Sequence, residues 1–381
     1  MADLSAAADP VLFRVIEAAN GRRIGIATLN SEKTLHAIGL PMIRPLDAQL
    51  RVWAADPAIA CVVLQAAGDK AFSAGGDVKT LAKAVRDAAP GSFPNPAALA
   101  FFTEEYRLDH RIHVYPKPLL CWGGGIVMGG GMGLFVGASH RVVTETTRAA
   151  MPEIAIGLFP DVGGSWFLPK LGAKAGLFAA LTGAPLNGAD LLAASLADFG
   201  LRQSDRDAVL ASLSTIDWTG DAAADRMALS AVLTARAEAV AGLLPPSKLA
   251  AQAAVIETMC AGDSFATVVA AITGYAGDDV WLQKAAAALK AGSPTTAALV
   301  WAVRARAAGL SLAEVFRMEL CIALHCCANP DFPEGVRALL IDKDHAPQWS
   351  PAGLAEIDPA LIAAYFDAPG WAAHPLADLA V

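Results

Sequence analysis

The chain has 381 residues, 55% of them apolar, which is enough to bury a sizeable core in one large domain with an appendage. Charged residues make up 17% and the net charge is -8, so the sequence has no basic surface for nucleic acid or for an anionic membrane. We therefore expect neither a nucleic-acid partner nor a membrane partner.

The first elements combine strands and helices. Residues 11–17 and 22–29 show strand patterns, and Asn20-Gly21 between them is a strong hairpin signal. A helix is predicted over 37–54, where apolar residues recur at three- and four-residue spacing. The short apolar run 61–66 is typical of a strand buried on both faces. The sequence AFSAGGDVKTL that follows turns out of this strand into another helix.

The same order repeats further along the chain. Residues 117–122 predict a strand, the glycine-rich segment after it a turn, MGLFVGAS the start of a helix, and 140–145 the next strand. This alternation predicts an α/β architecture, in which ligands gather at the carboxyl ends of the strands, where both glycine turns would lie. The Ala- and Leu-rich stretch 206–325 predicts helices. We expect an α/β core over 1–200 and a helical region over 201–381.

Three stretches invite other interpretations. Residues 118–139 are uncharged and long enough to span a bilayer, but their eight glycines disfavour a lipid-facing helix. His325-Cys326-Cys327 suggests a metal, yet adjacent ligands on a helix point about 100° apart. We expect no metal site, and we expect the six cysteines to be core thiols. The N-terminus has neither a basic region before an apolar run nor an Arg- and Ser-rich composition, so a cytoplasmic protein is expected.

The sequence has two glycine turns but no recognised nucleotide or metal motif. No P-loop, G-x-G-x-x-G or H-E-x-x-H pattern occurs. Gly75-Gly76 follows a strand and the triplet 129–131 precedes a helix. Two backbone N–H groups converging on one oxygen form an oxyanion hole, in which losing one donor costs about 3 kcal/mol. The alternative is that these glycines only permit tight turns and close packing, and spacing alone favours that alternative.

Two acids lie in a strongly apolar stretch, residues 149–171. Glu153 and Asp161 are surrounded there by Met, Ile, Leu and Phe, company in which carboxylates rarely occur without a partner or a task. Partial desolvation would raise the pKa of such a carboxyl group and make it a better base near neutral pH. A helix cap or a buried ion pair is the alternative for either residue taken singly.

Several segments resemble the crotonase superfamily. They are 71–79 (AFSAGGDVK), 128–134 (MGGGMGL) and 151–169 (MPEIAIGLFPDVGGSWFLP). Residues 331–349 (DFPEGVRALLIDKDHAPQW) are similar to a segment of its 3-hydroxyisobutyryl-CoA hydrolase branch that ordinary hydratases lack. The resemblance runs from about residue 11 to 366 and is weakest across 205–290. It implies a crotonase-like core of repeated ββα units and hydrolysis of a short 3-hydroxyacyl-CoA, with 3-hydroxyisobutyryl-CoA, a compound of valine breakdown, as the leading candidate.

The resemblance also implies roles for residues at the reacting centre. The N–H groups of Gly76 and Gly130 would flank the thioester carbonyl, and Glu153 matches the catalytic glutamate. Asp161 matches a second acid that helps to hold the substrate's 3-hydroxyl or the attacking water. Glu105 matches a further acid that contacts the substrate in the hydrolase branch.

The CoA part of the substrate is expected along residues 71–76. The residues matched there are Ala71, Ser73, Ala74 and Gly75, and Lys33 and Lys79 are candidate partners for the phosphates. No cofactor is implied, because CoA arrives as part of the acyl-CoA substrate. The oligomeric state stays open, and a homo-oligomer is compatible with the pattern.

Three positions depart from the family pattern. Gly133 stands where hydratases carry a second glutamate, which argues against hydration by a glutamate pair. Gly124 stands where hydrolases carry His, and His36 replaces an Asn. These departures bear on the exact substrate more than on the reaction class. Two alternatives stay open beside hydrolysis: a hydratase or isomerase that uses Glu153 alone, against which Gly133 and the FPDVGG segment weigh, and a non-catalytic acyl-CoA-binding protein on the same fold.

Overall fold

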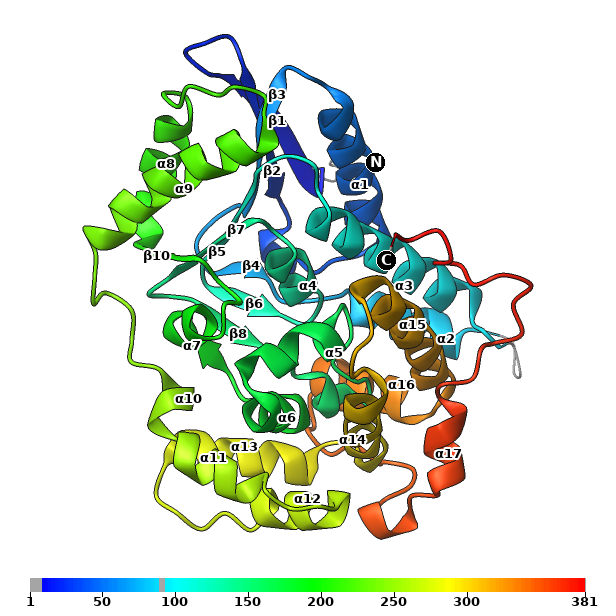
Figure 1. The fold of residues 1–381 in the computed structure, drawn as a ribbon. Helices are drawn as coiled ribbons and strands as arrows, with labels where there is room; N and C mark the ends of the chain where they lie inside the picture. The colour runs from blue at the N-terminus through cyan, green and yellow to red at the C-terminus, as the bar shows by residue number, and fades with distance from the viewer. Residues whose placement is uncertain (1–8, 89–92, 381) are drawn as a thin grey trace, which may run out of the picture.

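Two β-sheets organise the chain in the computed structural model, which describes residues 9–88 and 93–380 (Figure 1). The larger sheet has the order β1-β2-β3-β5-β7-β10, with bounds β1 Val11–Glu17, β2 Arg23–Leu29, β3 Ile59–Ala66, β5 Leu119–Gly123, β7 His140–Thr144 and β10 Phe199–Leu201. The smaller sheet has the order β4-β6-β8-β9, with bounds β4 Ala71–Ser73, β6 Ile126–Met128, β8 Arg148–Ala150 and β9 Leu186–Asn187. The pairings from β2 to β10 are parallel, which confirms the α/β architecture.

The hairpin at the start of the larger sheet is confirmed. β1 and β2 pair antiparallel, with Val11 opposite Leu29 and Glu17 opposite Arg23. The turn between them contains Gly21 with a φ of +80°, a left-handed conformation that glycine adopts at little cost. The Asn20-Gly21 signal therefore set the register of the first two strands.

The larger sheet is covered on both faces. All eight residues of β3 are buried. Its Cys61 and Val63 belong to the apolar layer under α8 (Arg206–Leu213) and α9 (Ala222–Glu238), which lie on one side of the sheet in Figure 1. Its Val62 and Leu64 belong to the main core, together with residues of α1 (Leu40–Ala55) and α3 (Pro96–His113). The uninterrupted apolar run in the sequence reflects this double burial.

Strand, strand and helix recur in the expected ββα order. β3 and β4 are followed by α2, and β5 and β6 by α4. The remaining helices have the bounds α2 Val78–Arg86, α4 Gly130–Val136, α5 Gly164–Phe167, α6 Ala173–Thr182, α7 Gly188–Ala193, α10 Lys248–Ala251, α11 Ala253–Met259, α12 Phe265–Thr273, α13 Val280–Ala291, α14 Pro294–Arg306, α15 Leu312–Ala328, α16 Asp331–Val336 and α17 Pro359–Ala364. The expected helical character of 206–325 is confirmed. One apolar core runs from Val11 to Leu376, so the helical region shares it with the sheets; the division at residue 200 stays a prediction.

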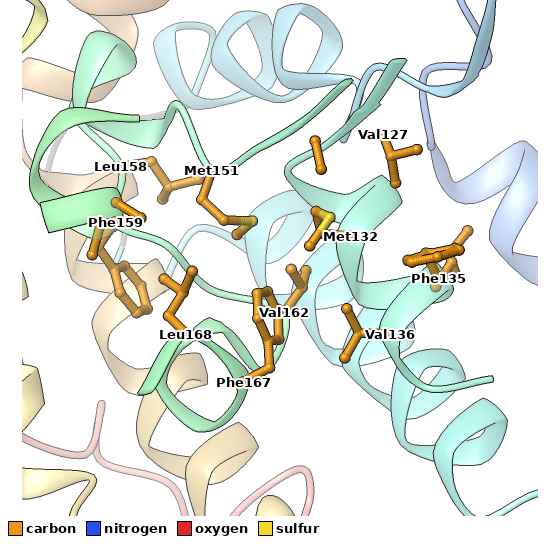
Figure 2. Packing of buried hydrophobic residues seen from close by; sticks show 14 of the residues in the cluster. Val127, Met132, Phe135, Val136, Met151, Leu158, Phe159, Val162, Phe167 and Leu168 are labelled. Atoms are coloured by element: carbon orange, nitrogen blue, oxygen red, sulfur yellow. The ribbon is translucent and has the colours of Figure 1, made fainter. Parts of the chain in front are cut away.

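The smaller sheet was not predicted, because its strands are only two or three residues long. β6 lies inside the glycine-rich segment that was expected to be a turn, and α4 already begins at Gly130. Figure 2 shows the result, a layer of apolar side chains from Val127 and Phe135 through Met132 to Phe159. The glycine segment is therefore held firmly against the core.

The uncharged stretch 118–139 is divided among β5, β6 and α4. None of the helices within the described ranges has the length and apolarity needed to cross a membrane. All six cysteines are free and buried, as expected of core thiols. Among residues 9–88 and 93–380, no group of three or more His, Cys, Asp or Glu side chains is arranged to hold a metal ion. Residues 1–8, on which part of the targeting interpretation rested, lie outside the described residues.

Candidate active site

A cavity of about 330 Å³ brings together residues from distant segments. Seven of the residues singled out in the sequence line it: Ala74, Gly75, Gly76, Glu105, Gly130, Glu153 and Asp161. The other lining residues are mostly apolar, namely Val78, Phe101, Phe102, Met128, Gly129, Pro152, Ile156, Leu158, Val162, Leu339 and Leu340. The cavity is therefore an apolar chamber with a few polar groups, the usual character of a small-molecule site.

The two glycine turns meet backbone to backbone at this cavity. A Cβ placed on Gly75 would lie 3.0 Å from the carbonyl oxygen of Met128 and 3.5 Å from the nitrogen of Gly130. A Cβ on Gly130 would lie 3.3 Å from the nitrogen of Gly76 and 2.6 Å from Oε1 of Glu105. Gly75 also has a φ of +102°, a conformation that favours glycine, whereas a side chain on Gly130 would displace the carboxyl group of Glu105.

The amides of Gly76 and Gly130 are free to bind a ligand. Neither N–H donates a hydrogen bond among those that the described residues form. Gly130 opens α4, and the first N–H groups of a helix have no acceptor within it. Two free N–H groups on touching turns fit the description of an oxyanion hole.

Glu153 lies beside these amides at the start of η2, a 3-10 turn over Glu153–Ile156. Its side chain is 5% exposed, its Oε2 has no partner among the described residues, and its Oε1 lies 2.8 Å from where a Cβ on Gly129 would stand. Burial raises the pKa of Glu153 well above its usual range, and the nearby Asp161 raises it further. Such a carboxyl group is a stronger base than an exposed glutamate.

A hydrogen bond from the helical region holds the turn that carries Glu153. The N–H of Ser293, the N-cap residue of α14, donates to the carbonyl oxygen of Ile154 over 3.0 Å. The hydroxyl of Ser293 donates to Oδ2 of the buried Asp331 over 2.6 Å. The helical region therefore fixes one side of the cavity.

Asp161 follows η2 in the chain, lines the same cavity as Glu153 and is 4% exposed. Its Oδ2 accepts a hydrogen bond of 2.7 Å from the hydroxyl of Tyr106, which follows Glu105 on α3. Burial raises the pKa of Asp161 to about 7, although the Tyr106 hydrogen bond acts in the opposite direction. Glu105 is 2% exposed and its Oε1 has no partner among the described residues. Burial, with Asp109 and Asp161 nearby, raises its pKa well above the usual range.

Two further buried acids were missed. Asp109 lies one turn after Glu105 on α3, is 2% exposed, and neither of its carboxyl oxygens has a partner in the described part of the chain. A Cβ on Gly133 would lie 2.9 Å from Oδ2 of Asp109, so this acid fills the space beside the glycine that replaces the hydratase glutamate. Glu319 of α15 accepts from the N–H groups of Gly163 (2.7 Å) and Ser165 (3.0 Å) and so holds the turn after Asp161. The available signal for Asp109 was its spacing of four from Glu105.

Four expected CoA contacts do not line the cavity. Ala71 and Ser73 are buried in β4, and the Ser73 hydroxyl donates to the carbonyl oxygen of His36 (2.9 Å) while accepting from the N–H of Gly75 (3.1 Å). Ser73 therefore shapes the glycine turn, and its hydroxyl is already occupied. Lys33 and Lys79 are exposed and lie outside the cavity lining.

The two remaining departures from the family pattern lie in loops away from the cavity lining. A Cβ on Gly124 would fall 1.9 Å from Oε1 of Gln203, whose side chain fills that space. His36 accepts from the N–H of Ser31 (2.9 Å) at Nδ1 and bonds the carbonyl oxygen of Ala67 (3.0 Å) through Nε2. Both residues therefore act on local loop structure.

Comparison with known proteins decides the family. The model of the enoyl-CoA hydratase/isomerase family matches residues 24–366. The chain belongs to this family. A Danio rerio protein named 3-hydroxyisobutyryl-CoA hydrolase, mitochondrial, is 37% identical, and the match covers 93% of this chain and 88% of that protein. The Homo sapiens protein of the same name is 35% identical over 87% of this chain and 83% of its own length.

Solved structures of this family support the same fold. A carnitinyl-CoA dehydratase from Mycobacterium thermoresistibile has a TM-score of 0.81 and 34% identity, covering 94% of this chain and 97% of its own. An enoyl-CoA hydratase from Rhodobacter sphaeroides 2.4.1 has a TM-score of 0.78 and 31% identity, with the same coverage of 94% and 97%. The resemblance to the crotonase superfamily and to its hydrolase branch is confirmed.

One expectation is overturned by these relatives. The Danio rerio, Xenopus laevis and Homo sapiens proteins are all named mitochondrial, so the expectation of a cytoplasmic protein is wrong. That expectation rested only on the composition of the first residues, which has no physical link to the chemistry of the cavity.

Proposed function

We propose that this chain hydrolyses the thioester of a short 3-hydroxyacyl-CoA, with 3-hydroxyisobutyryl-CoA as the leading substrate. One observation carries the proposal: the free N–H groups of Gly76 and Gly130 meet beside the buried carboxyl group of Glu153 in one cavity. The relatives that are 35–37% identical and bear the name 3-hydroxyisobutyryl-CoA hydrolase support the same reaction.

The mechanism follows from these groups. The two N–H groups stabilise the negative charge that develops on the thioester oxygen. Glu153 either takes a proton from the attacking water or attacks the carbonyl carbon itself, giving a mixed anhydride that water then cleaves. In both routes the C–S bond breaks, the sulfur leaves as CoA thiol after gaining a proton, and the acyl group leaves as the free hydroxy acid. Asp161 orients the 3-hydroxyl or the water.

The chief rival is hydration or isomerisation, the chemistry in the name of the matching family model; the two similar solved structures are named as a carnitinyl-CoA dehydratase and an enoyl-CoA hydratase. A hydratase that uses a glutamate pair needs a carboxyl group at the position of Gly133. Here a Cβ at 133 would collide with Asp109 and with Val162, so a glutamate does not fit. A non-catalytic acyl-CoA-binding protein is the other rival. Release of free thiol from acyl-CoA, scored together with the acid product, separates hydrolysis from both rivals, and a change in the acyl chain with the thioester intact separates the hydratase or isomerase from the binding protein.

The carboxyl group of Asp161 predicts a preference for acyl groups that carry a 3-hydroxyl. We expect 3-hydroxyisobutyryl-CoA to be cleaved roughly tenfold to a few hundredfold faster than isobutyryl-CoA, because a buried acceptor at Asp161 is left unpaired when the hydroxyl is absent. Kinetic constants for the two thioesters, with the wild type and Asp161→Ala, measure this ratio. The ratio of the rate on 3-hydroxyisobutyryl-CoA to the rate on isobutyryl-CoA should be smaller in the Asp161→Ala variant, and the Asp161→Asn variant should keep part of the wild-type ratio. Equal rates of the wild type on both thioesters would contradict a role for Asp161 in recognising the hydroxyl.

The buried acids also predict the pH dependence. The base form of Glu153 is required, and its pKa lies well above the usual range, with that of Asp161 at about 7. Since a raised pKa means that the base form is lost as the pH falls through it, kcat/KM should decline well above the ordinary carboxyl range, and the base form of Asp161 should be lost as the pH falls through about 7. A profile from pH 5 to 9, with circular dichroism at each pH to exclude unfolding, checks this. A rate that stays flat down to pH 5 would mean that both carboxyl groups titrate in their ordinary range.

A further inference from the structure

One wall of the cavity comes from a part of the chain that is distant in sequence. The other lining residues lie between Ala74 and Val162, whereas Leu339 and Leu340 belong to a single π-helical turn, Arg337–Ile341. Both leucines are half-buried. The next residue, Ile341, is 42% exposed and does not line the cavity. The turn therefore presents two apolar side chains to the chamber that holds the glycine amides and Glu153.

The helix before this turn is packed against the turn that carries Glu153. A Cβ on Gly335 of α16 would lie 2.6 Å from the Cα of Ile156. From the other side, Gly157 has a φ of +66°, and a Cβ there would lie 2.5 Å from the carbonyl carbon of Asp331. Two glycines, one on each partner, thus allow backbone-to-backbone contact. Because no side chain lies between the two backbones at these points, neither segment can move toward the other, and close packing fixes the position of α16 relative to the turn that carries Glu153.

The turn itself is held by one guanidinium group. Arg337 donates to both carboxyl oxygens of Glu334 over 2.8 and 2.9 Å. It also donates to Oδ2 of Asp342 over 2.7 Å and to Oδ2 of Asp344 over 2.6 Å. These three carboxylates lie before and after the two leucines in the chain. A planar, forked donor is suited to join them in a fixed geometry, which a lysine would not do equally well.

We propose that the Leu339–Leu340 turn sets the upper limit on the length of the acyl chain, with Arg337 as the positioning residue that holds the turn. The inference rests on the proposed function, since it requires an acyl-CoA in this cavity. The cavity volume of about 330 Å³ is at the small end of ligand sites, about 300–1,000 Å³, and Leu339 and Leu340 are part of its lining. In the proposed arrangement the acyl chain points toward these leucines, so a chain longer than a short acyl group would meet them. The two leucines act by exclusion and take no part in bond breaking.

The test is a series of 3-hydroxyacyl-CoAs, from 3-hydroxypropionyl- through 3-hydroxyhexanoyl- to 3-hydroxyoctanoyl-CoA, scored for kcat/KM by thiol release. Leu339→Ala and Leu340→Ala should raise the ratio of the hexanoyl to the propionyl value by about tenfold or more, the scale of one or two carbons in an apolar pocket. Ile341→Ala is the matched control from the same turn, and its ratio should equal that of the wild type. An unchanged ratio in both leucine variants overturns the proposal.

Arg337→Gln tests the positioning role. It should shift the ratio in the same direction as the leucine variants, while Arg337→Lys should shift it less. A merely structural role would lower the melting temperature and leave the ratio unchanged, which would overturn this part of the proposal.

Binding separates this inference from the proposed function. Non-hydrolysable thioether analogues of the same chain lengths give Kd values by calorimetry. If the wild type releases no thiol from any thioester, the proposed function fails, and the Kd series still reports the length limit. If the leucine variants change Kd equally for every analogue and for CoA alone, the turn contacts the CoA moiety and not the acyl chain, which would contradict the proposal.

Discussion

Glu153→Gln should lower turnover by about 100-fold or more, the usual scale for losing general-base catalysis, while the protein stays folded. The substitution keeps the shape of the side chain but removes the group that either activates water or attacks the thioester. Glu153 is 5% exposed and forms no ion pair among the described residues, so the neutral amide removes no stabilising partner. Thiol release under saturating 3-hydroxyisobutyryl-CoA measures the loss.

The matched control for this variant is Glu104→Gln. Glu104 lies next to Glu105 on α3 but is paired with Arg44 at the surface and does not line the cavity. It should keep normal turnover. Near-normal hydrolysis by the Glu153→Gln variant would show that another group supplies the base, and the assignment of Glu153 would have to be abandoned.

Gly130→Val should reduce turnover by about 100-fold or more, the scale of losing one oxyanion donor, because the valine side chain would keep the thioester oxygen away from the Gly130 N–H and would displace Glu105. The amide of Gly130 lies at the start of α4, against the Gly76 turn. Steady-state kinetics and thermal unfolding, measured on the same preparation, give the two losses separately.

The neighbouring Gly131 supplies the control, since a Cβ there would be 2.8 Å from the carbonyl oxygen of Ser73 but Gly131 does not line the cavity. Gly131→Ala should therefore lose stability, with activity falling only in proportion to the folded fraction. If Gly130→Val shows that same proportional pattern, the glycine is needed for packing alone, which was the simpler interpretation of the sequence.

The sequence predicted those parts of the molecule whose signals are local. Asn20-Gly21 determined the first hairpin, and the apolar run of β3 reported burial on both faces. Glu153 could be singled out because it is an acidic residue in an apolar stretch and because it lies in a family motif. The strands of the smaller sheet were missed because two or three residues, as in β4 and β9, cannot show an alternation.

Other parts of the site depend on contacts between distant segments, which no local pattern reports. Asp109 reaches the region of Gly133 only because α3 packs beside α4, and Leu340 reaches the cavity only because α16 packs on η2. The Ser73 hydroxyl bonds the backbone of His36 and Gly75, so it shapes the glycine turn, and its contact with CoA stays a prediction. Motifs thus indicated the candidate site, whereas tertiary packing determined which residues line the cavity around it.

The acids around the cavity have a consequence for the whole chain. Five of them, Glu105, Asp109, Glu153, Asp161 and Glu319, are buried, and within the described residues none is paired with a cation. Burial raises the pKa of each in the folded state. Between the ordinary carboxyl pKa of about 4 and these raised values, the folded chain binds more protons than the unfolded chain. Folding near neutral pH therefore takes up protons from solution. The stability that these groups contribute is complete below the ordinary pKa and is lost as the pH rises through the raised values. These five acids therefore take up protons when the protein folds and release them when it unfolds.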